Sequence, residues 1–239
     1  MNIMKRVILF LLTFCSPLCS KTFAQTPHQI ETDLLKSFKK IDYWEQQRYK
    51  DTSLSWIPKL FQANQDFGKK LQFYAHKYPA TITYSFNLLV KQHLYICTSS
   101  DGLFRIYSWD TETGGTMHFF DNVMQYKSGT TTKVIVDTPK GEGDNRPNYH
   151  KMYTFHANGK SFYLTVYLDI GSSKDIAEGI HIYTIKDGNL QDANLIKTYT
   201  CFLSDVSYSY DFWSVVILLM TNDRGFDLTT LQKLFICQS

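Results

Sequence analysis

From Ala80 onward, apolar and polar side chains alternate along the chain with a period of two, the pattern of strands that bury one face. Parallel strands need a long crossover between them, usually a helix. No segment with helical spacing separates these runs, so the pattern favours an antiparallel sheet. The predicted strands are Ala80–Val90, His93–Thr98, Leu103–Trp109, Thr116–Tyr126, Thr132–Asp137, Met152–His156, Ser161–Ile170, Gly179–Lys186, Leu195–Cys201 and Val206–Phe212.

Three dipeptides typical of tight hairpin turns lie between these runs: Asp101-Gly102, Asn158-Gly159 and Asp187-Gly188. A type I′ turn needs a positive φ at both central residues, which Asn, Asp and Gly adopt most readily. Residues 80–216 are therefore predicted to form one antiparallel β domain, a meander that curves into a sandwich or a partial barrel. Residues 139–150, rich in Gly and Pro, are predicted to be a loop. Residues 217–239 form a tail whose structure the pattern leaves open.

Residues 25–79 show helical spacing instead. Apolar side chains three or four positions apart indicate two amphipathic helices, joined near Asp51 and ended by Pro79. The positions that carry the pattern are Ile30, Leu34, Phe38, Ile41, Trp44, Ile57, Leu60, Phe67, Leu71 and Tyr74. The fold class predicted for the whole chain is α+β, an N-terminal helical hairpin followed by a large antiparallel β-meander.

The first 24 residues have the features of a secretory signal peptide. Lys5 and Arg6 precede an uncharged apolar run, residues 7–14, which is too short to span a bilayer as a helix. Cleavage is predicted after Ala24, which places the mature protein in the periplasm or outside the cell with no transmembrane segment. Acylation of Cys15 or Cys19, as in a lipoprotein, is the less favoured alternative because large residues precede both cysteines.

Removal of this leader leaves 22 basic and 22 acidic residues, so the mature chain has no net charge that would favour nucleic acid as a partner. Three widely spaced cysteines remain, Cys97, Cys201 and Cys237, and they do not make a disulfide framework. Cys97 and Cys201 could pair in an oxidising compartment, or all three could be small buried side chains.

The most distinctive segment of the chain is 99–120, which contains Asp101-Gly102, the run from Arg105 to Asp110, and Gly114-Gly115 followed by His118. In this segment the chain resembles an uncharacterised family of secreted bacterial proteins with the pattern DGxxRIYSWDxxxGGTxH. The resemblance implies export and a β-rich fold. It implies no activity and no catalytic residue.

On an extended strand, Arg105, Tyr107 and Trp109 point to one face and their neighbours to the other. With Asp110 in the turn and His118 on the returning strand, they could form a polar and aromatic ligand-binding surface. The alternative is a purely structural hairpin. If the surface exists, several aromatic side chains are expected to be exposed together. They are Tyr107, Trp109, Tyr163, Tyr167 and Tyr183.

Enzymatic motifs are absent from the sequence. There is no zinc-binding motif, nucleotide-binding glycine pattern or nucleophile elbow, and the acidic stretch from Asp110 to Glu112 is a poor match to a calcium loop. No catalytic residue, metal ligand or cofactor is therefore assigned. A secreted hydrolase of unfamiliar type is the alternative, and it would need a cleft where a histidine meets carboxylates. The candidate histidines are His118, His150, His156 and His181.

The function that the sequence favours is a non-enzymatic binding or interaction module of the bacterial envelope, which takes a glycan, a peptide or an envelope protein. A third possibility is that the protein packs against a neighbour. In that case one broad apolar patch is expected on its surface.

Overall fold

A computed structural model describes residues 25–137 and 146–214 of the chain. The predicted signal peptide, the whole of the tail and part of the predicted loop lie outside these residues. Two long helices, α2 (Pro27–Gln46) and α3 (Trp56–Lys77), form an antiparallel hairpin through the 3-10 turn η1 (Gln47–Tyr49). None of the described helices is both long and apolar enough to cross a membrane.

The start and end of the helices follow from local chemistry. Thr26 makes a capping box with Gln29, in which each side chain accepts a hydrogen bond from the backbone of the other, at 3.3 and 2.9 Å. Pro27 occupies the first turn of α2, where its missing N–H costs nothing. At the other end of the hairpin, Tyr78 precedes a proline and is extended, which ends α3.

The segment predicted as the first strand, Ala80–Val90, is not a strand. It forms the 3-10 turn η2 (Pro79–Ile82) and the short helix α4 (Asn87–Val90). The reason is a buried carboxylate on α2, because Glu31 accepts hydrogen bonds from the backbone N–H of Leu88 at 2.6 Å and the hydroxyl of Tyr84 at 3.0 Å. These bonds hold the segment against the helix instead of in a sheet.

The described strands form two main antiparallel sheets. Sheet A has the order β1-β2-β3-β4, and sheet B has the order β11-β7-β6-β5 with β8 paired to β7. A small hairpin of β9 and β10 lies between β8 and β11 in the sequence. The bounds are β1 Tyr95–Thr98, β2 Phe104–Asp110, β3 Phe120–Ser128, β4 Thr131–Asp137, β5 Asn148–Ala157, β6 Lys160–Ile170, β7 Asp175–Lys186, β8 Asn189–Asp192, β9 Ile196–Lys197, β10 Phe202–Leu203 and β11 Asp205–Asp211.

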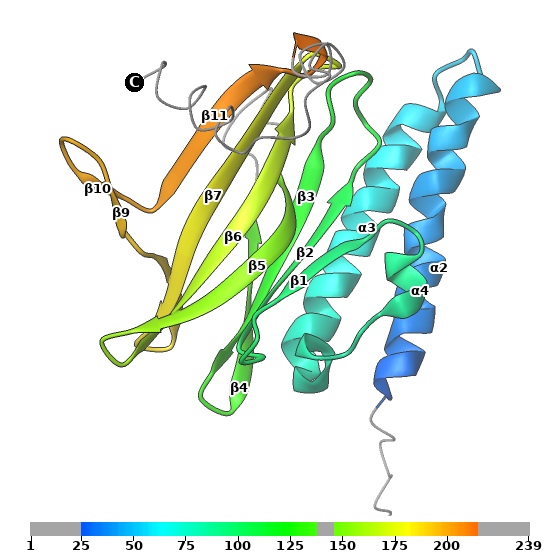
Figure 1. The fold of residues 1–239 in the computed structure, drawn as a ribbon. Helices are drawn as coiled ribbons and strands as arrows, with labels where there is room; N and C mark the ends of the chain where they lie inside the picture. The colour runs from blue at the N-terminus through cyan, green and yellow to red at the C-terminus, as the bar shows by residue number, and fades with distance from the viewer. Residues whose placement is uncertain (1–24, 138–145, 215–239) are drawn as a thin grey trace, which may run out of the picture.

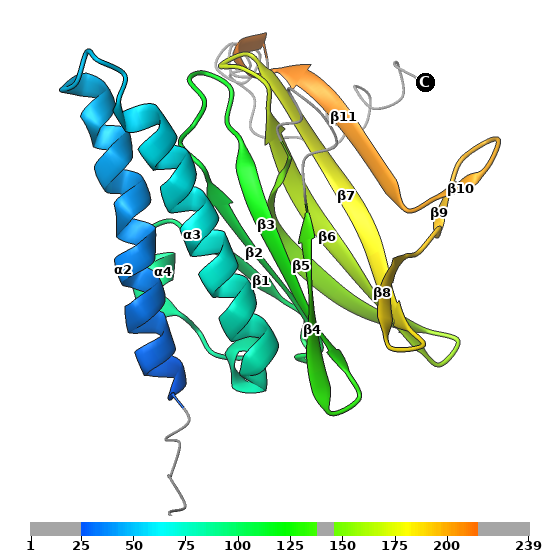
Figure 2. The same cartoon turned by 180° about the vertical axis from the view of Figure 1, so that it is seen from behind.

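These elements are stacked in three layers, with the helices on one side, sheet A in the middle and sheet B on the other side (Figures 1 and 2). One core, built around Phe67 and Trp109, lies between the helices and sheet A. A second core, built around Phe104 and Tyr163, lies between the two sheets. The α+β class and the antiparallel sheets predicted from the sequence are confirmed.

The two sheets meet along one edge. The thiol of Cys97 on β1 donates a hydrogen bond to the backbone oxygen of Tyr149 on β5 at 3.4 Å, and the N–H of Ser100 donates to the hydroxyl of Thr154 at 3.0 Å. Cys97 and Cys201 are both free thiols, so the possible disulfide is not formed. Cys97 is buried, as one hypothesis expected, whereas Cys201 is exposed. Cys237 lies outside the described residues.

Candidate functional site

Arg105 and Tyr107, two of the predicted ligand-binding residues, are buried in a polar network between sheet A and the helices. The Arg105 guanidinium donates to the backbone oxygens of Thr81 at 2.8 Å and Tyr84 at 2.6 Å. The Tyr107 hydroxyl donates to the amide oxygen of Gln125 at 2.9 Å. These side chains satisfy the irregular backbone after α3, and neither is open to a ligand.

Trp109 is also buried, with 1 % of its surface exposed. Its ring meets Phe67 edge to face at 5.0 Å and lies over Gly68 of α3. Its indole N–H donates to the side-chain oxygen of Asn64 at 3.1 Å, and the Asn64 amide in turn donates to the backbone oxygen of Thr111 at 2.8 Å. Trp109 therefore joins sheet A to α3.

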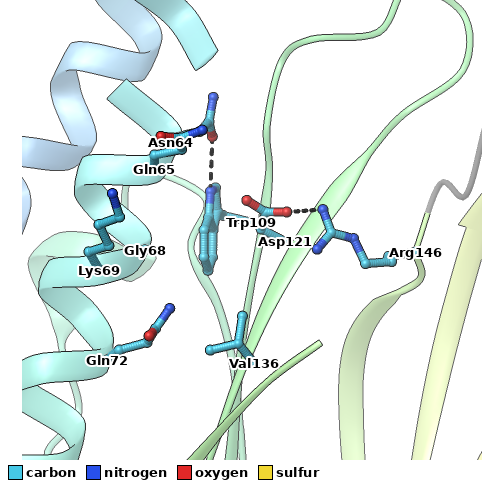
Figure 3. Close-up of a pocket in the computed structure, with 9 residues that line it drawn as sticks. All are labelled: Asn64, Gln65, Gly68, Lys69, Gln72, Trp109, Asp121, Val136 and Arg146. Carbon is cyan, nitrogen blue, oxygen red and sulfur yellow. Dashed lines mark hydrogen bonds and ion pairs between the residues drawn. The ribbon is translucent and has the colours of Figure 1, made fainter. Parts of the chain in front are cut away.

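A groove of about 180 Å³ lies beside Trp109, between α3 and the edge of sheet A (Figure 3). The acid at its wall, Asp121, pairs with Arg146, which lies beyond it on the side away from α3 (Figure 3). Burial raises the pKa of Asp121 and the Arg146 charge opposes that rise. The volume is below the 300–1,000 Å³ typical of ligand pockets. The described residues that line it are Asn64, Gln65, Gly68, Lys69, Gln72, Trp109, Asp121, Val136 and Arg146.

Asp110 and His118, the other two predicted site residues, lie together at the end of sheet A. The Asp110 carboxylate pairs with the His118 ring, and its second oxygen accepts the backbone N–H of Glu112 at 2.8 Å. Burial, together with the charges of Asp110 and Glu45, raises the pKa of the Glu112 carboxyl to about 7. No three His, Cys, Asp or Glu side chains in the described part of the chain are arranged to hold a metal ion.

The predicted exposed aromatic surface is wrong. Strand β2 lies between the helices and sheet B, so both of its faces are covered. The remaining aromatic side chains of the prediction face inward from sheet B onto sheet A. None of the set is more than 8 % exposed, and its members are Tyr107, Trp109, Tyr163, Tyr167 and Tyr183.

A different histidine, His181 on β7, meets two carboxylates. Its Nε2 lies 2.9 Å from an oxygen of Asp192 at the end of β8, and its Nδ1 lies 3.3 Å from an oxygen of Asp205 at the start of β11. The Tyr167 hydroxyl donates to the other oxygen of Asp205 at 3.0 Å. The imidazole stacks on Tyr183 with ring centroids 4.1 Å apart.

This histidine cluster is the arrangement that the hydrolase hypothesis required, but both nitrogens of His181 are occupied by carboxylates. A general base needs one nitrogen for the nucleophile and one for its orienting partner. Within the described residues, no Ser, Thr or Cys side chain hydrogen-bonds the imidazole. The cluster therefore links β7 to β8 and β11, and among the described residues no nucleophile is bonded to His181.

The segment between the two carboxylates projects from sheet B as a hairpin, which we call the arm (residues 193–204; Figures 1 and 2). Tyr199 at its tip is fully exposed, and 57 % of the surface of Phe202 is exposed. Leu195 and Leu203 are also exposed, as is the thiol of Cys201. Hydrogen bonds from Thr198 and Thr200 lower the pKa of that thiol.

The outer face of sheet B, turned away from sheet A, is apolar as well. Phe162 and Ile182 point to this face. Because side chains alternate along a strand, every second residue counted from them points to it as well. They are half-buried or exposed, and they include Tyr153, Leu164, Val166, Leu168, Ile180 and Val206. Apart from the arm, no described helix or strand lies over this face (Figure 1).

Sequence reasoning missed the arm, and it named His181 only as one of four candidate histidines, without its carboxylate partners. The alternation placed Leu195–Cys201 in an ordinary strand, and Asp192, Asp205 and His181 follow no periodic pattern. Comparisons of the chain with protein-family models, with curated proteins and with solved structures found no match.

Proposed function

We propose that the protein is an exported, non-enzymatic interaction module of the bacterial envelope, which binds another polypeptide through the arm and the adjoining outer face of sheet B. The observation that carries the proposal is the exposure of Tyr199 and Phe202 at the tip of a projecting hairpin. Large apolar side chains grouped on a surface mark interaction sites, and aromatic residues are enriched there.

The chemistry of the arm favours a polypeptide over a glycan. Sugar and small-molecule sites combine an aromatic side chain with several convergent polar groups in a concave site. The arm instead projects, and its exposed side chains Leu195, Phe202 and Leu203 are apolar. Such a surface fits an apolar groove or sheet on a partner.

Charge narrows the class of partner further. Lys197 is the single charged residue of the arm, and a carboxylate stands at each of its ends, Asp192 and Asp205, while Lys151 lies on β5 at the opposite edge of sheet B. Carboxylates at both ends of the arm disfavour acidic partners and attract basic ones. The partner that fits is an apolar segment flanked by lysine or arginine.

The binding test uses the full chain on two arrays, one of glycans and one of 15-residue peptides. Each peptide has an apolar centre, with either lysine or glutamate at both flanks. We expect binding to the lysine-flanked peptides, reduced at least tenfold by Tyr199→Ser with Phe202→Ser. Tyr43→Ser is the matched control, because Tyr43 is an exposed tyrosine on α2 in the opposite layer.

Two outcomes would overturn the proposal. One is glycan binding that the arm variants leave unchanged. The other is the absence of any peptide preference that depends on the arm.

Export is proposed on the basic and apolar character of residues 1–24 and is tested separately. We expect the protein recovered from the periplasm or medium of an expressing bacterium to begin at Gln25. A form that stays in the cytoplasm with Met1 intact contradicts export, and a diacylated form that begins at Cys15 or Cys19 shows the lipoprotein alternative instead.

A further inference from the structure

The two ends of the arm are held by adjacent residues of β7. Asp192 directly precedes the arm, Asp205 directly follows it, and the ring of His181 lies between their carboxylates at 2.9 and 3.3 Å. Beside this ring, Ile182 donates its N–H to the backbone oxygen of Ser204 and accepts the N–H of Ala193, both at 2.8 Å. The side chain of His181 and the backbone of Ile182 therefore both hold the two ends of the arm. We call the contacts of the His181 ring with Asp192 and Asp205 the His181 clamp.

The His181 clamp depends on a proton. The protonated imidazole has an N–H on each nitrogen and can donate to both carboxylates, whereas the neutral ring has one N–H and one acceptor. The neutral ring therefore leaves one carboxylate facing a nitrogen lone pair, an unfavourable contact. Among side chains, histidine is the one whose charge ordinarily changes between about pH 5 and about pH 8.

The tyrosines around the ring stay protonated in that range. Burial and the Asp205 charge raise the pKa of Tyr167 to about 12, and burial raises the pKa of Tyr183 well above its usual value. Tyr149 and Asp137 lie beyond Tyr183, and burial also raises the pKa of Tyr149. From β6, the Thr165 hydroxyl reaches only the backbone oxygen of His181.

We propose that His181 is a positioning residue for the arm, which binds the carboxylates at both of its ends when protonated and loses its hold on one of them when neutral, so that this end is held by the remaining hydrogen bonds alone. The inference deepens the proposed function, because it gives the binding arm a control by pH. An arm fixed at both ends presents Tyr199 and Phe202 in one place, so binding would cost less conformational entropy at low pH.

Hydrogen–deuterium exchange on the full chain tests the clamp without any partner. After correction for the intrinsic effect of pH on exchange, we expect amides of residues 193–204 to exchange on the order of tenfold faster at pH 8 than at pH 5. His181→Gln removes the charge and is expected to exchange at the fast rate at both pH values. His156→Gln is the matched control, since His156 is exposed near the end of β5, which β6 separates from β7, and hydrogen-bonds only Ser161 among the described residues.

A second variant guards against a folding defect in His181→Gln. Asp192→Asn alters a half-exposed carboxylate, removes the charge at one end of the clamp, and is expected to weaken the pH effect. Arm exchange that does not change with pH, or a change that persists in His181→Gln, overturns the clamp. Because the exchange measurement uses no ligand, the clamp can fail while peptide binding stands, and the reverse.

Discussion

Sheet A and sheet B have the same alternating pattern of apolar and polar residues, but their strands differ in how far they are exposed to solvent. In β2 of sheet A, six consecutive residues from Phe104 to Trp109 are buried, because helices cover one face and sheet B covers the other. In β11 of sheet B, the central residues from Val206 to Ser209 are all exposed. The difference lies in the number of covering layers, which a period of two does not encode.

The comparison changes how the polar residues of each sheet are interpreted. On sheet A, Arg105, Gln125 and Thr132 occupy positions that an amphipathic strand would expose, but they are buried and hydrogen-bonded to backbone near α3. Buried polar groups are tolerated when they are paired in this way. The outer face of sheet B shows the reverse, because apolar side chains there, such as Tyr153 and Val206, are exposed.

The largest effect is expected from Trp109→Ala on the helix side of sheet A. Removing a fully buried indole leaves a cavity between α3 and β2 and deprives Asn64 of a hydrogen bond. We expect a loss of about 3–5 kcal/mol in the free energy of unfolding, measured by chemical denaturation. Tyr153→Ala on the exposed face of sheet B is the control and should cost less than about 1 kcal/mol. Equal losses would break the distinction between the two sheets.

A smaller effect is expected from Gly179→Ala on the inner face of sheet B. A Cβ at this position would lie 2.3 Å from the Tyr167 ring, so the ring must move and its hydrogen bond to Asp205 is lost. We expect a destabilisation of about 1–3 kcal/mol by denaturation. In a Tyr167→Leu background the same substitution should cost clearly less, and an unchanged cost would show that the ring does not limit this site.

Local features of the fold could be predicted from the sequence. The helix spacing correctly identified Ile30, Leu34, Phe38 and Ile41 as buried. The turns at Asn158-Gly159 and Asp187-Gly188 have positive φ at both residues, as type I′ turns require. At Asp101-Gly102 the glycine alone has a positive φ. Each of these features depends on neighbours within a few residues.

Features that depend on stacking could not be predicted. Nothing local to Tyr107 or Trp109 indicates that α3 lies above them, and Tyr163 faces β2 only because the two sheets pack together. The pair Asp192 and Asp205 becomes a clamp only after β8 and β11 both reach the region of His181. The sequence therefore predicts the candidate site on its most distinctive segment, where Arg105, Tyr107 and Trp109 are buried.

A pH-dependent effect is expected from Glu112→Gln, at the end of sheet A near α2. The folded state raises the pKa of this carboxyl from 4.5 to about 7, so ionisation opposes folding. Stability contributed by the protonated form is complete below about pH 4.5 and is lost as the pH rises through about 7. Glutamine stays uncharged, so at pH 8 the variant should be more stable by about 1 kcal/mol, a figure reduced for partial exposure, and at pH 4 equally stable. Thermal unfolding at both pH values measures this difference, and a gain of equal size at pH 4 would contradict it.

The smallest effect on folding is expected from Tyr199→Ser in the arm. Its side chain is fully exposed and makes no contact that burial would stabilise, so the free energy of unfolding should change by less than about 0.5 kcal/mol. The same substitution at Tyr163, buried between the sheets, removes a comparable ring from a packed core and should cost several kcal/mol, about 3–5 for an aromatic side chain. Chemical denaturation of the two variants compares one residue type in two environments. A large loss at Tyr199 would mean that the arm packs against its own chain in solution, and its aromatic tip would then not be open to a partner.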